Sequence, residues 1–434
     1  MYLAWQAAFR SVQYQNTSDD PSTLDRTITF TINDGDAASN QLARNISIVP
    51  VNDVPTQAAI ESPPLVYNEN DAPTAITSSI TLADLDDTLI ESATVTITQN
   101  YTAAEDILGF ENFPSITGSF DAASGTLTLT GSASIQEYIT ALRTVTYENS
   151  SDNPITLART VEINVNDGEV DSTSLSRIIE INSVNDAPLG EDNVVTVLED
   201  TDYTLSTSDF GFSDSLDQNN LAGVIINQLP TMGELTLAGS TVTSGQFINA
   251  AAITSGDLVF SPEPNANGTA YDRFEFSLVD DGGTAFNGSD TSVDVNEIVF
   301  DVININDAPS GQDAIITTPE DTTYIFSRED FGFSDIQDND DFVAITITTL
   351  PEDGALTIDG VEVTTGSVVD IADIDSGLLT YAPPLDVNGL GFNGLGFQVH
   401  DNGGTSNGGD FIDPTVNFIN FDLPGVNDLS LIHI

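Results

Sequence analysis

The chain contains 434 residues, enough for three or four domains, and 39% of them are apolar, which predicts packed cores rather than disorder. Its formal charge is −60, from 68 acidic and 8 basic residues. Such a surface repels phosphate groups, which argues against nucleic acids and anionic membranes as partners. Cysteine is absent, which excludes disulfides and thiolate chemistry. No run of about 18 apolar residues occurs, so we expect no membrane insertion.

The first region, residues 1–55, begins in the middle of a repeated pattern. Four of its residues recur at a constant offset of 133: Arg10, Tyr14, Arg26 and Arg44 correspond to Arg143, Tyr147, Arg159 and Arg177. Met1 aligns in the same register with Ser134. These matches predict that residues 1–55 are the truncated C-terminal half of a domain. Residues 27–32 alternate between polar and apolar side chains, which predicts a strand.

The second region, residues 56–188, contains the complete form of this pattern. Alternation over 125–129 and 159–165 predicts strands. No segment has a long helical period, but short candidates such as residues 135–142 could form one or two helical turns.

The third and fourth regions, residues 189–309 and 310–428, match each other at an offset of 121. The run 209–214 recurs as 330–335, and strands are predicted at 233–237 and 274–278. Periods this long are too large for a solenoid unit and predict independent domains in tandem. Many short strands separated by turns favour β-sandwiches.

An Asn-Asp dipeptide closes each region, at 52–53, 185–186, 306–307 and 427–428. A proline follows two residues after the aspartate in the first three cases. The last six residues, 429–434, break the pattern, and we expect them to be a non-native tail.

These linkers resemble those between cadherin domains, with "VNDVP" at 51–55, "VNDAP" at 184–188 and "INDAP" at 305–309. The runs "LPTMGELTLAG" and "ITSGDLVFSPEPNANG" are similar to chondroitin-sulphate-proteoglycan-type repeats of large bacterial surface adhesins. The resemblance implies an all-β string of cadherin-like, immunoglobulin-like Greek-key sandwiches. It also implies a secreted or cell-surface protein with calcium between consecutive domains.

The acidic residues at the expected junctions suit such a site. Calcium takes about six to eight oxygen ligands, more than any single loop here supplies, so ligands must come from both domains and the linker. At the first junction the candidates are Asn16, Asp19, Asn52, Asp53, Glu69, Asp84, Asp86 and Asp167. At the second they are Asn149, Asp152, Asn185, Asp186, Glu199, Asp200, Asp214, Asp217 and Asp280. At the third they are Asn265, Asn267, Asn306, Asp307, Glu320, Asp321, Asp335, Asp338 and Asp401.

The sequence departs from cadherins in two places, since the linker lacks the full "DxNDN" run and the "LDRE" element is replaced. Each asparagine or aspartate has the alternative role of an ordinary turn residue. The acidic surface has the alternative role of a solubilising coat in a salt-adapted organism.

The predicted function is a calcium-bound stalk or adhesive region of a large adhesin, without enzymatic activity. The expected partners are cell-surface or matrix glycans or proteins. The carboxylates repeat from domain to domain, which fits structure or metal binding better than one active site. Two alternatives remain: an array of glycan- or matrix-binding modules, and an enzyme whose catalytic part lies elsewhere.

Overall fold

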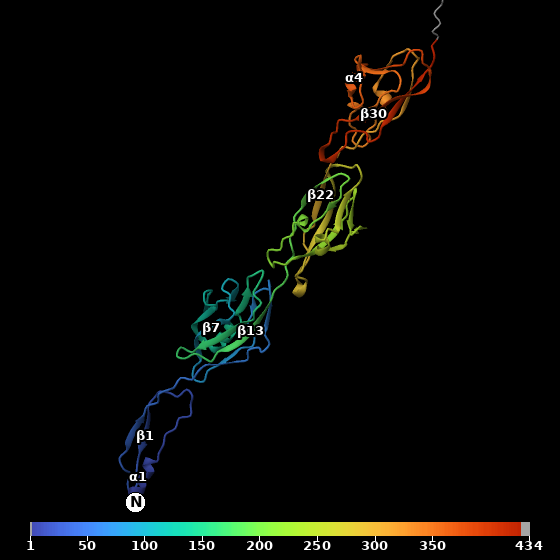
Figure 1. The fold of residues 1–434 in the computed structure, drawn as a ribbon. Helices are drawn as coiled ribbons and strands as arrows, with labels where there is room; N and C mark the ends of the chain where they lie inside the picture. The colour runs from blue at the N-terminus through green and yellow to red at the C-terminus, as the bar shows by residue number, and fades with distance from the viewer. Residues whose placement is uncertain (1, 427–434) are drawn as a thin grey trace, which may run out of the picture. The chain divides into compact units, whose positions relative to one another are not determined.

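The computed structural model describes residues 2–426, which form many strands and a few short helices (Figure 1). Two compact units are present. The first contains the described residues up to Pro188 with the loops Ser213–Leu221 and Val279–Val293, and the second contains the remainder. The Asn427-Asp428 dipeptide and the predicted tail 429–434 lie outside the described residues.

The first region contains one helix and one strand pair. These elements are α1 (Tyr2–Arg10), β1 (Arg26–Phe30) and β2 (Leu42–Ile46). β1 and β2 pair antiparallel, with Arg26 opposite Ile46. Phe9 of α1 packs edge-on against Phe30, with ring centroids 5.7 Å apart.

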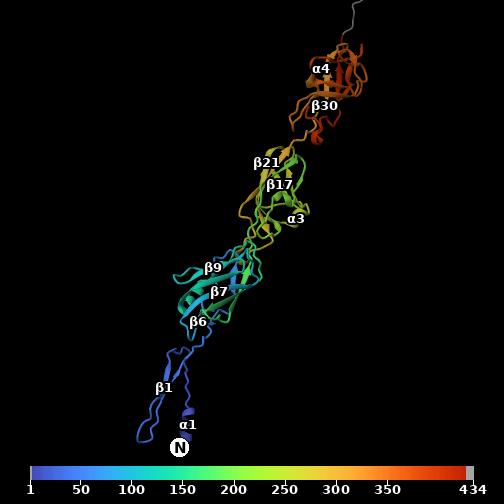
Figure 2. The ribbon, with the colours of Figure 1, turned by 90° about the vertical axis from the view of Figure 1, so that its left-hand side faces the viewer.

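A complete sandwich follows, with its main sheet in the order β4-β13-β12-β7-β10-β9 and a facing sheet β5-β11-β8. Figure 2 labels β6, β7 and β9 of this sandwich. Its strands are β3 (Thr56–Ala58), β4 (Leu65–Asn68), β5 (Thr74–Ala75), β6 (Thr81–Ala83), β7 (Leu89–Gln99), β8 (Asp106–Gly109), β9 (Thr117–Asp121), β10 (Thr126–Ser134), β11 (Thr146–Asn149), β12 (Arg159–Asn166) and β13 (Leu175–Asn182). The expected helix is α2 (Ile135–Leu142), which begins with a capping box between Ser134 and Glu137.

The next sandwich has the sheets β14-β22-β21-β16-β19 and β15-β20-β17-β18. Its elements are β14 (Asn193–Leu198), β15 (Tyr203–Thr204), η1 (Thr207–Phe210), β16 (Leu221–Gln228), β17 (Gly233–Leu237), β18 (Ser240–Thr241), β19 (Phe247–Asn249), α3 (Ala250–Thr254), β20 (Leu258–Pro262), β21 (Gly268–Asp280), η2 (Ala285–Asn287) and β22 (Asn296–Ile303).

The last sandwich repeats this topology, with sheets β23-β31-β30-β25-β28 and β24-β29-β26-β27. Its elements are β23 (Ala314–Thr317), β24 (Tyr324–Ile325), η3 (Arg328–Phe331), β25 (Ala344–Thr349), β26 (Ala355–Ile358), β27 (Val361–Glu362), β28 (Val368–Asp370), α4 (Ile371–Asp375), β29 (Leu379–Ala382), β30 (Gly389–His400), η4 (Ser406–Gly408) and β31 (Asn417–Leu423).

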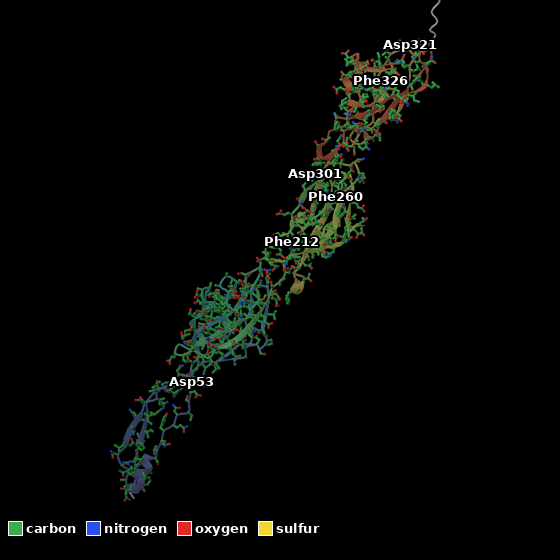
Figure 3. The ribbon with its side chains drawn as sticks, viewed as in Figure 1. Asp53, Phe212, Phe260, Asp301, Asp321 and Phe326 are labelled. Atoms are coloured by element: carbon green, nitrogen blue, oxygen red, sulfur yellow. The ribbon has the colours of Figure 1, made fainter. Side chains whose placement is uncertain are left out.

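Alternating side chains fill the space between the sheets. In the third region the rings of Phe260 and Phe300 stack with centroids 3.7 Å apart. Phe326 is buried in the core of the last sandwich, and Figure 3 labels it together with Phe260. Aromatic pairs of this kind stabilise a core beyond their area burial. The predicted all-β sandwich class is therefore confirmed. No helix in residues 2–426 is long and apolar enough to cross a membrane.

One feature of the topology positions the junction residues. In each sandwich the first strand of the main sheet pairs parallel with the last, with Asn68 opposite Asn182, Leu198 opposite Ile303 and Thr317 opposite Asp422. Parallel strands point their C-terminal ends to the same edge of a sheet. The residue that follows the first strand therefore lies beside the linker that follows the last strand.

Candidate metal sites at the repeat junctions

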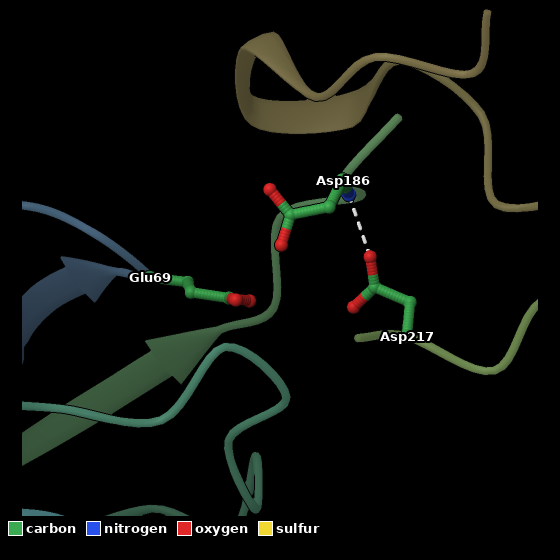
Figure 4. Close-up of side chains that lie close together, drawn as sticks. All are labelled: Glu69, Asp186 and Asp217. Atoms are coloured by element: carbon green, nitrogen blue, oxygen red, sulfur yellow. Dashed lines mark hydrogen bonds between the residues drawn. The ribbon is translucent and has the colours of Figure 1, made fainter. Parts of the chain in front are cut away.

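Three carboxylates meet at the second junction (Figure 4). Glu69 follows β4, Asp186 belongs to the linker, and Asp217 lies in the loop before β16; one oxygen from each lies within 4.8 Å of the others. The backbone N–H of Asp186 donates to Asp217 Oδ2 at 2.5 Å. Glu69 Oε2 accepts from the backbone N–H of Val184 at 2.8 Å. Backbone N–H groups thus hold the carboxylates of Glu69 and Asp217 beside that of Asp186.

Two oxygens of this cluster are buried without a donor. Glu69 is 3% exposed, and its Oε1 atom and Asp186 Oδ2 have no hydrogen-bond partner in the described part of the chain. Buried polar atoms are nearly always hydrogen-bonded, because desolvation without compensation is costly. These two oxygens therefore fit a cation that the carboxylates would share.

The electrostatics agree with this geometry. Burial raises the pKa of Glu69, Asp186 and Asp217, and repulsion from neighbouring carboxylates raises it further. Asp152 and Asp214 add to the repulsion on Asp186. A divalent cation would remove this repulsion, and an all-oxygen donor set suits calcium, which prefers hard ligands.

The third junction has the same arrangement. The N–H of Asp307 donates to Asp338 Oδ2 at 2.5 Å, as Asp186 does to Asp217. Glu199, which follows β14, is 1% exposed and accepts from Asn267 Nδ2 at 2.9 Å and from the N–H of Ile305. Burial raises the pKa of Asp307, with repulsion from Asp338 and Asp200 next.

Asn265 brings a side-chain amide to this junction. With its nitrogen turned toward them, it donates to Asp200 Oδ2 at 3.1 Å and to Asp307 Oδ2 at 3.2 Å. If the Asn265 oxygen instead faced Asp200 and Asp307, three acceptor oxygens would lie together without a donor. A cation could then satisfy all three oxygens.

The first junction also gathers carboxylates. The N–H of Asp53 donates to both oxygens of Asp86, at 3.1 and 3.2 Å. Asp84, Asp86 and Asp87 form a second group whose ligand atoms lie within 4.8 Å of one another. Asp84 Oδ2 is buried and has no partner among residues 2–426. Burial raises the pKa of Asp53, and Asp86, Asp19 and Asp84 contribute repulsion.

At each of the three junctions, the linker asparagine donates a hydrogen bond to an aspartate of the sandwich that follows. Asn52 Nδ2 donates to Asp167 at 2.8 Å, and Asn185 Nδ2 donates to Asp280 at 2.9 Å. Asn306 Nδ2 donates to Asp401 at 3.1 Å. Asp167 and Asp401 come directly after β12 and β30, and Asp280 is the last residue of β21.

The glutamates were assigned to the wrong junctions. The structure places Glu69 at the second junction rather than the first, and Glu199 and Asp200 at the third rather than the second. Glu320, expected at the third junction, instead accepts from the N–H of Val426 at 2.7 Å. Asp321 lies beside it and accepts from the N–H of Asp386 at 3.0 Å. The reason is the parallel pairing of first and last strands, which takes Glu69, Glu199-Asp200 and Glu320-Asp321 to the far end of their own sandwiches.

Two asparagines predicted as ligands have other hydrogen bonds. Asn149 is 4% exposed; its amide donates to Asp106 Oδ1 at 3.1 Å, and its Oδ1 accepts from the N–H of Ser151 at 3.0 Å. Asn16 is exposed and accepts from the N–H of Ser18 at 3.0 Å. Asp214 and Asp335 accept from the N–H groups of Asp217 and Asp338, at 3.1 and 3.2 Å, and hold those loops.

Three junction residues were missed by the sequence analysis: Asp87, Asn219 and Asp340. The available signal was position, because Asn219 and Asp340 each stand two residues after a predicted ligand and match at the offset of 121.

No protein-family model matches the chain. A segment of 91 residues, 20% of the chain, is 40% identical to halomucin of Haloquadratum walsbyi, and it spans 1% of that protein's length. Among solved structures, the chain is similar to mouse cadherin-23 EC22-24, at 14% identity and a TM-score of 0.37, covering 87% of this chain and 100% of that one. It is also similar to mouse protocadherin-24 EC1-3, at 12% identity and a TM-score of 0.38, covering 75% and 91%.

Proposed function

We propose that this chain is a calcium-binding array of extracellular sandwich repeats that serves as a stalk or adhesive region of a large surface adhesin, of the bacterial type. The observation that carries the proposal is the pair of buried oxygens without donors, Glu69 Oε1 and Asp186 Oδ2, beside Asp217. Besides calcium, we propose glycans or proteins of a cell surface or matrix as partners. We assign the chain no catalytic role.

Calcium would supply positive charge and several coordination positions at each junction. At the second junction Glu69 would contribute from one sandwich, Asp186 from the linker, and Asp217 from the following repeat. The cation would thereby tie a flexible linker to both neighbours. If each site had a Kd of about 10⁻⁴ M and free calcium were about a hundredfold higher, binding would add about 2.7 kcal/mol to the folded state.

The halomucin match supports a large secreted or surface protein. Halomucin is a very long polypeptide, because the 91 matched residues amount to 1% of its length. The absence of a lysine and the charge of −60 support a surface that interacts with cations rather than anions.

Thermal melts with calcium and with a chelator test the proposal. We expect calcium to raise the Tm of the chain, and we expect the double variant Asp186→Asn/Asp217→Asn to lose part of that increase. The matched control is Asp353→Asn/Asp359→Asn, which removes two charges from exposed turns. Identical melts with calcium and chelator would refute calcium binding. An equal loss of the calcium-dependent Tm increase in the control would show that net charge alone causes it.

A further inference from the structure

A cleft of about 530 Å³ lies in the 189–309 repeat, where the end of β16 meets β21 and β22. Ligand sites in proteins have volumes of about 300–1,000 Å³, so this cleft has the size of a small-ligand site. Arg273 of β21 lines it and is exposed, whereas the next residue, Phe274, is fully buried. Because side chains alternate between the faces of a strand, the cleft opens on the outer face of the main sheet.

Hydrogen bonds fix the turn after β16 to β21. Asp272 is 7% exposed, and its carboxylate accepts from the N–H of Thr231 at 2.9 Å and from the N–H of Met232 at 2.7 Å. The Tyr271 hydroxyl donates to the carbonyl oxygen of Met232. The two walls of the cleft are therefore joined, and the cleft is preformed, as small-molecule sites usually are.

Ala270 has a strained backbone in the wall of the cleft. Its φ angle is 47°, in the left-handed region that disfavours residues with a Cβ atom. The equivalent residue of the last repeat is Gly391, which adopts a φ of 70° without this cost. The N–H of Ala270 donates to Asp301 Oδ1 at 2.6 Å, which helps to hold the strained conformation. Such strain is concentrated at functional sites.

The lining of the cleft combines donors, acceptors and apolar surface. Arg273 and Glu297 form an ion pair across it, with 3.4 Å between Nη1 and Oε2. Gln228 is exposed, and its amide can both donate and accept. Tyr271 and Val299 add apolar surface. A sugar ring has hydroxyls around its rim, which donate and accept, and C–H groups on its faces, so its chemistry matches this lining.

The charge of the cleft favours a neutral sugar. Two carboxylates, those of Asp272 and Glu297, line it beside the single guanidinium of Arg273. The chain as a whole has a formal charge of −60. An acidic sugar would be repelled by this field, whereas a neutral sugar would not.

The last repeat has the same backbone frame but a different lining. Leu229-Pro230, at the edge of the cleft, recurs as Leu350-Pro351. A Cβ atom added at Gly396 would lie 3.1 Å from Phe418 Cε1, so an aromatic ring covers the equivalent surface there. The polar residues of the cleft are replaced at the offset of 121: Gln228, Arg273 and Glu297 correspond to Thr349, Gly394 and Phe418.

We propose that this cleft binds a neutral sugar unit of a glycan, and that it distinguishes the 189–309 repeat from the last one. Arg273 and Gln228 would donate to sugar hydroxyls, Glu297 would accept from them, and Tyr271 and Val299 would contact the C–H face of the ring. This inference rests on the proposed function, because it specifies one class among the partners proposed there.

Binding of three neutral hexasaccharides to the full chain in calcium tests the inference, by isothermal titration. The probes are cellohexaose, mannohexaose and chitohexaose. We expect at least one to bind with a Kd of about 1 mM or below, and Arg273→Ala to weaken that binding about tenfold. Glu297→Phe, which introduces the residue of the last repeat, should abolish binding by covering the cleft.

The matched control is Arg328→Ala, which removes an exposed, ion-paired arginine from the last repeat and should leave binding unchanged. Circular dichroism and melts establish that each variant has folded. If no probe binds at about 10 mM while calcium still raises the Tm, the inference is overturned and the calcium-binding function stands. If a probe binds Arg273→Ala and Arg328→Ala equally well, its site lies elsewhere and the inference is also overturned. Binding that is lost in Arg273→Ala, without any effect of calcium on the Tm, would support the cleft and refute the calcium-binding function.

Discussion

The first region and the second half of the 56–188 sandwich have the same residues at matching positions but opposite burial. Arg159 is fully buried and Tyr147 is 0% exposed, whereas Arg26 is partly exposed and Tyr14 is 42% exposed. The local hydrogen bonds are nevertheless the same. Arg26 donates to the carbonyl oxygens of Leu24 and Ser22, and Arg159 donates to their counterparts in Leu157 and Ile155.

In the 56–188 sandwich, β8 pairs with β11 and supplies a carboxylate to the buried residues. In the sandwich, Asp106 of β8 accepts from Arg159 Nε at 3.0 Å, from the Tyr147 hydroxyl at 2.6 Å and from Asn149 Nδ2 at 3.1 Å. The comparison teaches that local sequence sets the conformation around the arginine. A carboxylate from a distant strand decides whether that arginine is buried.

The largest expected effect comes from removing this carboxylate. Asp106→Ala removes the carboxylate nearest to the buried guanidinium of Arg159 and leaves only Glu105, at 3.6 Å, so we expect the sandwich to lose about 3–5 kcal/mol. Hydrogen-exchange mass spectrometry of peptides from β8, β11 and β12 measures this loss locally. Arg26→Ala in the first region should change exchange there by less than about 0.5 kcal/mol. Equal losses of stability for Asp106→Ala and Arg26→Ala would contradict the different roles assigned to the two arginines.

A smaller effect is expected from the tyrosine pair. Tyr147→Phe removes one donor to buried Asp106, and a hydrogen bond to a charged group contributes about 1.5–3 kcal/mol. Tyr14→Phe removes a hydroxyl from a partly exposed ring and should be nearly neutral. The same exchange experiment compares them. A neutral Tyr147→Phe would show that the network tolerates the loss of this donor.

The smallest expected effect on stability depends on pH and involves Arg177 and its counterpart Arg44. Arg177 lies 3.6 Å from Glu61, whereas its counterpart Arg44 is exposed. Burial alone would raise the pKa of Glu61, but hydrogen bonds from Thr77 and Ser78 hold the pKa well below its ordinary value of 4.5. The carboxylate therefore stabilises the fold above about pH 4.5, and this contribution declines as pH falls further.

Glu61→Gln tests that contribution. We expect the variant to be less stable than the unaltered chain by about 1 kcal/mol at pH 7, with the difference shrinking toward pH 3. Arg44→Ala should show no such pH dependence. A difference that stays constant from pH 7 to pH 3 would contradict the lowered pKa.

Much of the fold was predictable from alternation and repeat offsets, but the sites were predictable only in part. The helix at 135–142 and the strand at 159–165 were predicted because their patterns are local. The placement of Glu69 was wrong because it depends on parallel pairing between strands more than a hundred residues apart, which no local pattern reports. Asp340 was missed because the fold brings its side chain close to Asn306 and Gly403, which are distant from it in sequence.

The parallel pairing of first and last strands has a mechanical consequence. A pull along the chain reaches β14 at its N-terminal end and β22 at its C-terminal end, and these two ends lie at opposite ends of the paired strands. The two strands are then drawn past each other lengthwise, and their hydrogen bonds share the load instead of opening one by one. Six residue pairs join β14 to β22, and four join β4 to β13, so tension is distributed over the most bonds in the 189–309 repeat.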